Sequence, residues 1–519
     1  MLTRHGRLET PCLLPVVNPV KQAFSIRKMR EIRDCQGVMT NAYILWKRLR
    51  DGIGDRSIHD ILGFDRVVAT DSGGYQVLEY GRVEADPTEI VKFQQKIDSD
   101  IAVILDVPTG SSAGRFQAKR TVDETLKRAQ EAQGLISDDH RLWMGPVQGG
   151  THLDLVQRSA SEISRMDFDI LALGSPTEIM ESQKYSVLAD MIAAAKEHAP
   201  LQKPFHLFGA GHPQTFALAV ALGCDLFDSA SYVLYARKGR YMTPTGTFRM
   251  QDLEWFPCPC RTCQEFTPRE ARALNPVQRE EFLAEHNLQV CFTEIRAVKN
   301  SIRAGRLWEL LESRAASNPK LLNALRQLSH HLPFIERLTP VSKPRSLVIT
   351  DLSAGLRPEV QRHIARLREG RVARVQTEIL MPEPETRPAS RSPPVQTLIE
   401  AMSSQPGLHL SFYSLPFSLI PLGVEEVFPI SQSESCLNEG DRQVKTIREL
   451  LPTYLQHIRP RTLILSADES KIGQYLKNAV PRLCRDNRIR LRIAYKGSAP
   501  WSAKGLEPVL SLIGARIES

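Results

Sequence analysis

The chain of 519 residues contains no long hydrophobic run. The longest apolar candidate, 216-FALAVALGCDLF-227, contains an aspartate and is shorter than the ~18 to 20 residues that a membrane-spanning helix needs. The first residues, MLTRHGRLETPCLLPVV, lack the apolar segment and small-residue cleavage site of a secretory signal peptide. We therefore expect a cytoplasmic protein with no membrane attachment.

Cysteine is also scarce, with nine residues in the whole chain. An odd, mostly scattered set argues against the disulfide framework of a secreted protein. Six of the nine read as ordinary small buried residues: Cys12, Cys35, Cys224, Cys291, Cys436 and Cys484. The other three lie together in 258-CPCRTC-263 and require a separate explanation.

The bulk composition is that of a globular protein. Hydrophobic residues make up 42% and charged residues 24%, so a packed core is expected, and the length predicts two to four domains. The formal net charge of +8 is compatible with a polyanionic partner such as nucleic acid, although charge alone indicates one only weakly.

Short apolar runs alternate with helix-like segments over the first 230 residues, which favours parallel strands joined by crossover helices. The runs are 12-CLLPVV-17, 38-VMTNAYI-44, 66-RVVAT-70, 101-IAVIL-105, 142-LWMGPV-147, 168-FDILAL-173, 204-PFHLF-208 and 224-CDLF-227. Eight such strands predict a closed (β/α)8 TIM barrel, an α/β fold. A doubly wound open sheet is the alternative.

Polar residues follow six of these runs. The segments are 71-DSGGYQ-76, Asp106, 148-QGG-150, 174-GSP-176, 209-GAGHP-213 and 228-DSAS-231. A single aspartate after a strand is usually a helix cap or turn residue. In a barrel, however, all the strand ends meet at one mouth, where active sites form. Three carboxylates, an amide and several glycines there predict a site for a polar, planar ligand.

The cysteine cluster has the spacing of a metal site. Cys258, Cys260 and Cys263 are followed after 22 residues by His286. Three thiolates and one imidazole are a donor set for a closed, structural, tetrahedral Zn²⁺ site, and cysteines this close cannot easily bridge one another. The intervening 268–288 reads as helical, so His286 would be placed by a helix. The alternative is three incidental cysteines.

The motifs DSGGYQ, ILD, PVQGG, LALGS, HLFGAGHP, GCDLFDSASY, CPCRTC and HNL together resemble the tRNA-guanine transglycosylases over residues 1–315. The segments GCDLFDSASYVLYARKGRYMT and LGSPTE are most similar to the archaeal, archaeosine-type branch, which inserts 7-cyano-7-deazaguanine into tRNA. The resemblance implies a pentosyltransferase that exchanges an encoded guanine for that base, with one structural Zn²⁺ per chain, no nucleotide cofactor and a homodimer.

The resemblance also implies roles for single residues. It makes Asp228 the nucleophile of a covalent glycosyl-aspartate intermediate and Asp71 the general acid/base. It assigns the substrate pocket to Ser72, Tyr75, Asp106, Gln148, Leu171, Gly174, Ser175 and Phe208. Within that pocket Asp106 reads the guanine edge, and Tyr75 and Phe208 sandwich the base. It assigns the zinc to Cys258, Cys260, Cys263 and His286.

Cations follow the expected nucleophile in 237-RKGR-240. Arg237, Lys238 and Arg240 would suit contacts to RNA phosphates near the reactive ribose. The alternative is a solvated surface loop.

The character of the chain changes after the barrel. We predict a catalytic domain over 1–315, a helical connector with a Pro-rich linker over 316–395, and an α/β accessory domain over 396–519 that is a candidate for RNA binding. The run 488-RIRLRI-493 reads as a charged edge strand or as a track for an RNA backbone. Archaeal members usually end in a further small RNA-binding (PUA) domain, and no segment after residue 500 is long enough for one.

Two other functions fit the same sequence. A related enzyme that inserts a deazaguanine into DNA would share the barrel and the zinc site. A non-catalytic partner subunit would also keep the barrel, although such a subunit has no reason to retain Asp71, Asp106 and Asp228 together.

Overall fold

The structure is a computed structural model that describes residues 1–19, 24–49, 52, 54–74, 86–136, 140–350, 354–370, 374–436 and 441–515. These residues form two compact units, Met1–Phe334 and Ile335–Ser519. The segment predicted as a connector, 316–395, contributes to both units. No described helix is both long and apolar enough to cross a membrane.

The first unit is built around eight parallel strands, as predicted. They are β3 (Cys12–Pro15), β4 (Gly37–Asn41), β5 (Val67–Asp71), β6 (Ile101–Val103), β7 (Leu142–Val147), β8 (Ile170–Leu173), β9 (Phe205–Leu207) and β10 (Leu226–Ser229). Their order is β3-β10-β9-β8-β7-β6-β5-β4, and a parallel bridge between Val16 and Met39 closes the ring. The fold is therefore a TIM barrel, and the open-sheet alternative is wrong.

The centre of the barrel is a packed core. Alternate residues of each strand point inward, so Cys12 and Leu14, or Val67 and Ala69, belong to one buried cluster. Leu8 lies in the same cluster below the first strand. The filled interior leaves the strand ends as the place where a ligand can bind.

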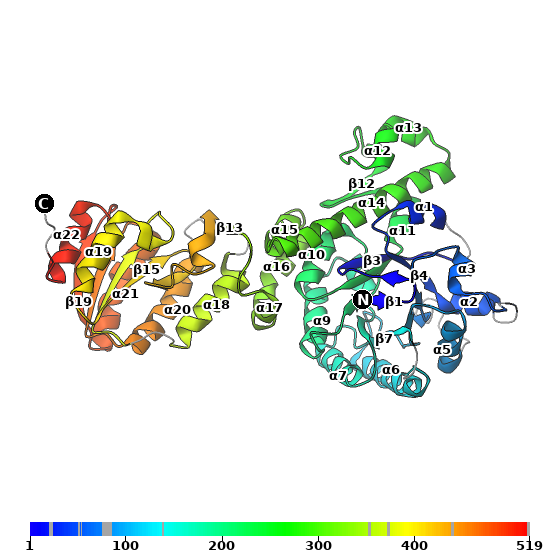
Figure 1. Cartoon of the computed structure of the whole chain (residues 1–519), viewed down its shortest axis with the longest axis horizontal. Helices are drawn as coiled ribbons and strands as arrows, with labels where there is room; N and C mark the ends of the chain where they lie inside the picture. The colour runs from blue at the N-terminus through cyan, green and yellow to red at the C-terminus, as the bar shows by residue number, and fades with distance from the viewer. Residues whose placement is uncertain are drawn as a thin grey trace. The chain divides into compact units, whose positions relative to one another are not determined.

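Helices surround this sheet (Figure 1). They are α1 (Ile26–Glu31), α2 (Ala42–Leu49), α3 (Ile58–Leu62), α5 (Pro87–Lys96), α6 (Arg115–Ile136), α7 (Leu153–Ser164), α8 (Thr177–Glu181), α9 (Tyr185–Glu197), α10 (Pro213–Ala221), α11 (Ser231–Arg237), α15 (Leu307–Ala315) and α16 (Pro319–Gln327). The start of α5 has a local cause in the sequence, because Pro87 occupies its first turn and Asp86 caps it. A short hairpin, β1 (Leu2–Thr3) with β2 (Gly6–Arg7), precedes the barrel.

A separate segment projects beyond the barrel (Figure 1). It contains the hairpin β11 (Arg240–Thr243) and β12 (Gly246–Arg249), followed by α12 (Arg261–Glu265), α13 (Pro268–Ala273) and the long α14 (Pro276–Arg303). The helix predicted over 268–288 is divided into α13 and α14. The break has a local cause: Pro276 has no backbone N–H to donate, and Asn275 caps the new helix by accepting from the N–H of Gln278.

The second unit is a smaller α/β domain. Its five-stranded sheet has the order β16 (Ser418–Pro421), β15 (Leu408–Ser414), β14 (Thr377–Pro382), β18 (Thr462–Ala467) and β19 (Arg490–Lys496), and β13 (Leu347–Thr350) pairs with β17 (Ser433–Cys436). Its helices are α18 (Pro358–Arg368), α19 (Pro393–Ser403), α20 (Asp441–Ile458), α21 (Lys471–Asp486) and α22 (Ala503–Leu512), while α17 (Leu332–Leu338) spans the boundary. The charged run 488–493 overlaps β19, which lies at the edge of the five-stranded sheet.

Candidate active site

One cavity of about 1280 Å³ opens at the carboxyl ends of the barrel strands. Its size exceeds what a single base would fill, since pockets for drug-sized ligands measure ~300 to 1,000 Å³. The structure brings seven of the predicted site residues to its wall: Asp71, Asp106, Gln148, Gly174, Ser175, Phe208 and Asp228. They come from six different strand ends.

Asp228 lies inside β10, where the pairing with β3 holds its backbone. Its Oδ1 accepts two hydrogen bonds, from Nε2 of His206 and from the backbone N–H of Gly209, each at 2.9 Å. Its Oδ2 has no hydrogen-bond partner within the described part of the chain. One oxygen is therefore held, and the other is left for a ligand in the cavity.

His206 is the residue behind Asp228, and the sequence reasoning missed it. The side chain is fully buried, and its Nδ1 has no hydrogen-bond partner among the described residues. Because a carboxylate can only accept, Nε2 carries the proton and donates it toward Asp228. The signal was present in the sequence: a histidine interrupts the apolar run 204-PFHLF-208.

Asp71 ends β5 in a half-buried position at the cavity wall. Burial, and then the negative charges of Asp106 and Asp228, raise its pKa to about 7. The amide of Asn41, which donates to Oδ2 at 3.1 Å, acts in the opposite direction. A carboxyl group with this pKa can both give and take a proton near neutral pH.

Asp106 and Gln148 form a directional pair. Burial raises the pKa of Asp106 to about 6, and the hydrogen bond from Gln148 opposes the rise. Nε2 of Gln148 donates to Oδ2 of Asp106 at 2.5 Å, while its Oε1 accepts from the N–H of Thr109 and from Oγ of Ser175. The amide is thus fixed in one orientation, and the pair offers acceptors and donors along one edge of the cavity.

Two glycines make room for this pair. A Cβ on Gly174 would lie 2.1 Å from Nε2 of Gln148, and a Cβ on Gly74 would lie 2.1 Å from Oδ1 of Asp106. No larger residue fits at either position without moving a polar group of the site.

Two further residues of the predicted pocket are described and do not reach the cavity wall. Ser72 and Leu171 are fully buried and do not line the cavity. The hydroxyl of Ser72 has no hydrogen-bond partner within the described ranges. Tyr75 lies outside the described residues.

Cations stand at the rim of the cavity. Arg237, Lys238 and Arg240 all line it, and Nε of Arg237 forms an ion pair with Glu280 at 2.9 Å. Lys320, at the start of α16, lines the same cavity and was not predicted, because it lies far along the chain from the other three.

The cysteine cluster converges as the spacing predicts. The ligand atoms of Cys258, Cys260, Cys263 and His286 all lie within 4.8 Å of one another. Nδ1 of His286 faces the thiols, 3.3 Å from Sγ of Cys263 and 3.5 Å from Sγ of Cys260. This group has the donors and the arrangement to hold one metal ion.

The histidine of this group is fixed by its surroundings. Nε2 of His286 lies 2.9 Å from the carbonyl oxygen of Met242, which requires the proton on Nε2 and leaves the lone pair of Nδ1 for a metal. The ring of Tyr241 stacks on the imidazole at 3.6 Å.

Comparisons with known proteins agree with these observations. A family model described as queuine tRNA-ribosyltransferase matches residues 1–320. Proteins named tRNA-guanine(15) transglycosylase from Methanococcus vannielii and Methanocaldococcus jannaschii are each 41% identical, over 438 and 437 residues. These matches cover 82% of this chain and 66% and 65% of the relatives.

A protein of the same name from Aeropyrum pernix is 46% identical over 336 residues, which cover 64% of this chain and 65% of the relative. The matches therefore span 65% to 66% of the length of these three relatives.

Proposed function

The chain belongs to the queuine tRNA-ribosyltransferase family, and from that premise we propose that it is a tRNA-guanine transglycosylase that replaces a guanine of tRNA with 7-cyano-7-deazaguanine. The names of its archaeal relatives support guanine 15 as the target. The observation that supports the chemistry most is the meeting of Asp71, Asp106 and Asp228 in one cavity.

The first step of this mechanism removes guanine. The free Oδ2 of Asp228 attacks C1′ of the ribose, a bond from carbon to that oxygen forms, and the glycosidic bond breaks. His206 and Gly209, which hold Oδ1, keep the second oxygen directed at the cavity. Asp71 in its protonated form gives the departing base its proton.

The second step reverses the first with a different base. The incoming deazaguanine loses a proton to Asp71, its nitrogen attacks C1′, and the bond to Asp228 breaks. Two inversions restore the original configuration at C1′. No oxidant or nucleotide is consumed, because one base replaces another.

Base recognition follows from the pair formed by Asp106 and Gln148. Ionised Asp106 accepts hydrogen bonds from N1–H and the 2-amino group of a guanine, a pattern that adenine does not present. Phe208 lines the cavity and supplies one aromatic wall. Tyr75 is proposed as the opposite wall, with Ser72 and the backbone near Leu171 supporting the pocket.

The rim and the metal group complete the proposal. Arg237, Lys238 and Arg240 contact phosphates of the tRNA beside the reactive ribose. The cysteine and histidine group binds Zn²⁺, for which three thiolates and an imidazole are a preferred set. That ion fixes the segment between β12 and α14 and takes no part in base exchange.

Incorporation of a labelled base tests this function. Labelled 7-cyano-7-deazaguanine and labelled guanine are supplied with a tRNA transcript, with the same transcript carrying adenine at position 15, and with duplex DNA. We expect label only in the unaltered transcript, mapped to position 15. Label in DNA alone would instead favour a DNA-modifying relative, and no label in any substrate would favour a non-catalytic subunit.

A further inference from the structure

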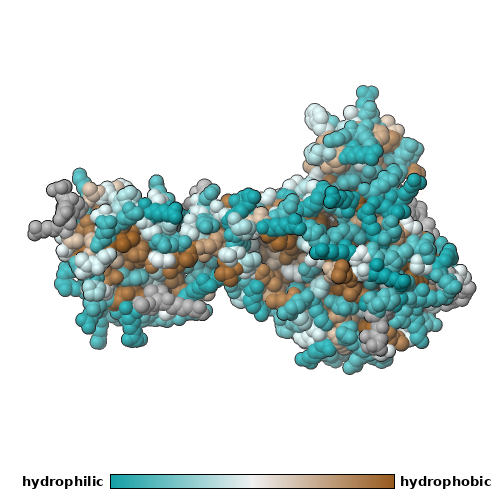
Figure 2. Space-filling view, viewed as in Figure 1, coloured by the Kyte–Doolittle hydropathy of each residue, from teal (hydrophilic) through white to brown (hydrophobic). Residues whose placement is uncertain are grey.

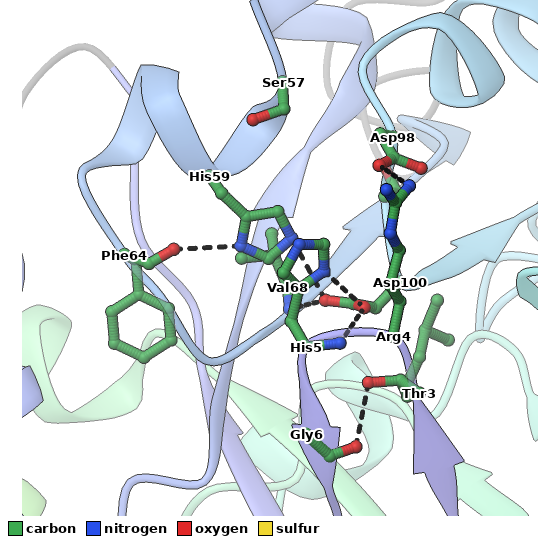
Figure 3. Close-up of polar contacts among 12 residues, drawn as sticks. Thr3, Arg4, His5, Gly6, Ser57, His59, Phe64, Val68, Asp98 and Asp100 are labelled. Carbon is green, nitrogen blue, oxygen red and sulfur yellow. Dashed lines mark hydrogen bonds and ion pairs between the residues drawn. The ribbon is translucent and has the colours of Figure 1, made fainter.

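A second group of potential metal ligands, drawn in Figure 3, precedes the barrel strands, at the end opposite the cavity. His5 comes from the turn between β1 and β2, His59 from α3, and Asp100 from the residue before β6. Their ligand atoms all lie within 4.8 Å of one another. Figure 3 shows both imidazole rings turned toward the carboxylate.

The hydrogen bonds of His59 determine where its proton is. Nδ1 of His59 lies 2.9 Å from the carbonyl oxygen of Phe64, and a carbonyl only accepts, so the proton sits on Nδ1. In the neutral ring Nε2 then carries a lone pair. This atom is buried, lies 3.2 Å from Oδ2 of Asp100, and has no hydrogen-bond partner among the residues described. A lone pair facing a carboxylate is unfavourable unless a proton or a metal ion lies between the two atoms.

Asp100 is held in place by the backbone. The N–H of Val68 donates to its Oδ2 at 2.9 Å, and the N–H of His5 donates to its Oδ1 at 3.2 Å. Nδ1 of His5 also lies 2.9 Å from Oδ1. The carboxylate side chain is fully buried, so its charge is exposed to the two imidazoles rather than to water.

Either one extra proton on His59 or one metal ion can satisfy this arrangement. The rings of His5 and His59 stack with their centroids 3.6 Å apart and their planes inclined by 31°. Two imidazolium cations at that separation repel each other, so protonation of both histidines is unfavourable. One divalent ion would face both nitrogens and the carboxylate at once.

We propose that His5, His59 and Asp100 bind a second metal ion, Zn²⁺ or another divalent ion of the first transition row. Two imidazoles and a carboxylate are common ligands of these ions. The nitrogen-to-oxygen separations of 2.9 and 3.2 Å are close to the ~3.3 Å between ligands of a tetrahedral ion with bonds of ~2.0 Å. The carbonyl of Phe64 orients His59 as the outer partner that such a histidine usually has.

The ion would have a structural role. His5 is 29% exposed at its side chain, which leaves room for a water molecule as the fourth ligand and a path for the ion. The three ligands lie on segments far apart in the sequence, so the ion would tie the first hairpin to the base of the barrel. This site is independent of base exchange.

Metal analysis of the purified full chain tests the site. We expect two bound metal ions in the wild type and one in His5→Ala and in His59→Gln. His140→Ala is the matched control, because His140 contacts Asp98 at the same end of the barrel and is not part of the group. That variant should keep both ions.

Cobalt titration provides a second reading on the unaltered chain. After metal removal, Co²⁺ bound by thiolates gives intense charge-transfer absorption, whereas Co²⁺ bound by nitrogen and oxygen gives only weak bands. Uptake of a second equivalent with weak bands alone supports the site. A wild type that takes up a single ion with the thiolate spectrum overturns it, as does a second ion that both variants retain.

Discussion

The residues at the barrel mouth give its carboxyl groups different properties. Asp71 is half-buried and Asp106 is buried, and the partial removal of their carboxyl groups from water raises their pKa values to about 7 and about 6. Asp228 instead shares one oxygen with two donors, His206 and Gly209. The same side-chain type can therefore serve as a proton carrier and as a nucleophile within one cavity.

Removal of the proposed nucleophile should stop the reaction without harming the fold. Asp228→Asn keeps an oxygen for His206 and Gly209 but loses the anionic oxygen that we propose attacks C1′. We expect base exchange to fall at least ~10³-fold and the covalent enzyme–tRNA adduct to disappear from denaturing gels. Asp154→Asn, at an exposed ion pair with Arg115, should behave as the wild type. An adduct that persists would refute the role of Asp228.

Asp71 should make the folded chain less stable at high pH. The folded-state pKa is raised from 3.8 to about 7, so the folded state binds this proton more tightly than the unfolded state. The free energy of unfolding therefore falls as the pH rises from 3.8 through 7. Above pH 7 this loss of stability is at most about 4 kcal/mol.

Asp71→Asn removes the buried charge. We therefore expect a higher melting temperature than the wild type at pH 8 and little difference at pH 4. The control is Asp65→Asn, at an aspartate whose side chain is 63% exposed. An equal melting temperature at both pH values would show that Asp71 is not buried as an anion.

Gly174 should be necessary for base recognition. In Gly174→Ala the new Cβ would collide with Nε2 of Gln148, displace the amide and break its bond to Asp106. We expect a loss of base affinity of about 10- to 100-fold with the fold retained, measured by calorimetry with the free base. Gly110→Ala lines the same cavity, has nothing within 4 Å of its new Cβ, and should bind normally.

At the scale of elements, we expect the projecting segment to depend on the metal ion that its cysteine and histidine group would hold. The helices α12 and α13 are short, with five and six residues, and most helices of that length are not stable alone. The ligands Cys258, Cys260 and Cys263 connect this segment to His286 on the long α14. The metal would therefore provide much of the local stability.

Cys263→Ala should expose this dependence. We expect the variant to lose one zinc ion per chain and to destabilise the segment by several kcal/mol, because a structural ion contributes its binding energy to folding. Metal analysis and hydrogen exchange over residues 250–290 would measure the two effects. Cys484 is a buried cysteine of the second unit, and Cys484→Ala is the control. This variant should keep the zinc content and the hydrogen-exchange pattern of the wild type. Unchanged zinc in Cys263→Ala would contradict the assignment.

The strands were the most predictable elements, and their ends were less so. All eight barrel strands appear where apolar runs lie in the sequence, because a strand buried on both faces must be apolar throughout. The last run was predicted as 224–227, whereas β10 extends to Ser229. Pairing of Ser229 with Pro15, distant in sequence, extends the ladder and places Asp228 within it.

The site was predictable only in part. Residues directly after a strand, such as Gln148, could be assigned to the mouth from topology alone. The role of His206 was missed, because its contact with Asp228 depends on the register between β9 and β10 and on which way the side chain points. The exclusion of Leu171 from the cavity wall likewise required side-chain directions that spacing does not supply.

At the scale of the whole molecule, the projecting segment carries apolar side chains on its surface. Trp255 is 78% exposed, Val277 76% and Phe248 47%. Figure 2 shows tan and brown atoms among the hydrophilic ones on this segment. Large exposed apolar residues often mark a protein–protein contact, and the family resemblance implies a homodimer through the zinc region.

We therefore predict that the chain forms a dimer with twice its mass of 58.4 kDa. Light scattering should detect that mass for the wild type and a shift toward monomer for Trp255→Ser combined with Val277→Ser. Phe116→Ser is the control, since Phe116 is also 78% exposed but belongs to α6. A monomeric wild type, or the same shift in the control, would contradict the prediction.

The closure of the barrel also has a consequence for synthesis on the ribosome. β3, near the start of the chain, pairs with β10 and is bridged to β4. One edge of β3 therefore has no partner strand until residues 226–229 have left the ribosome. At ~5 to 20 residues per second, that delay lasts on the order of 10 to 40 s. During this time the apolar stretch CLLPVV has no eighth strand to cover it. The nascent chain therefore offers a binding site to chaperones for much of its own translation.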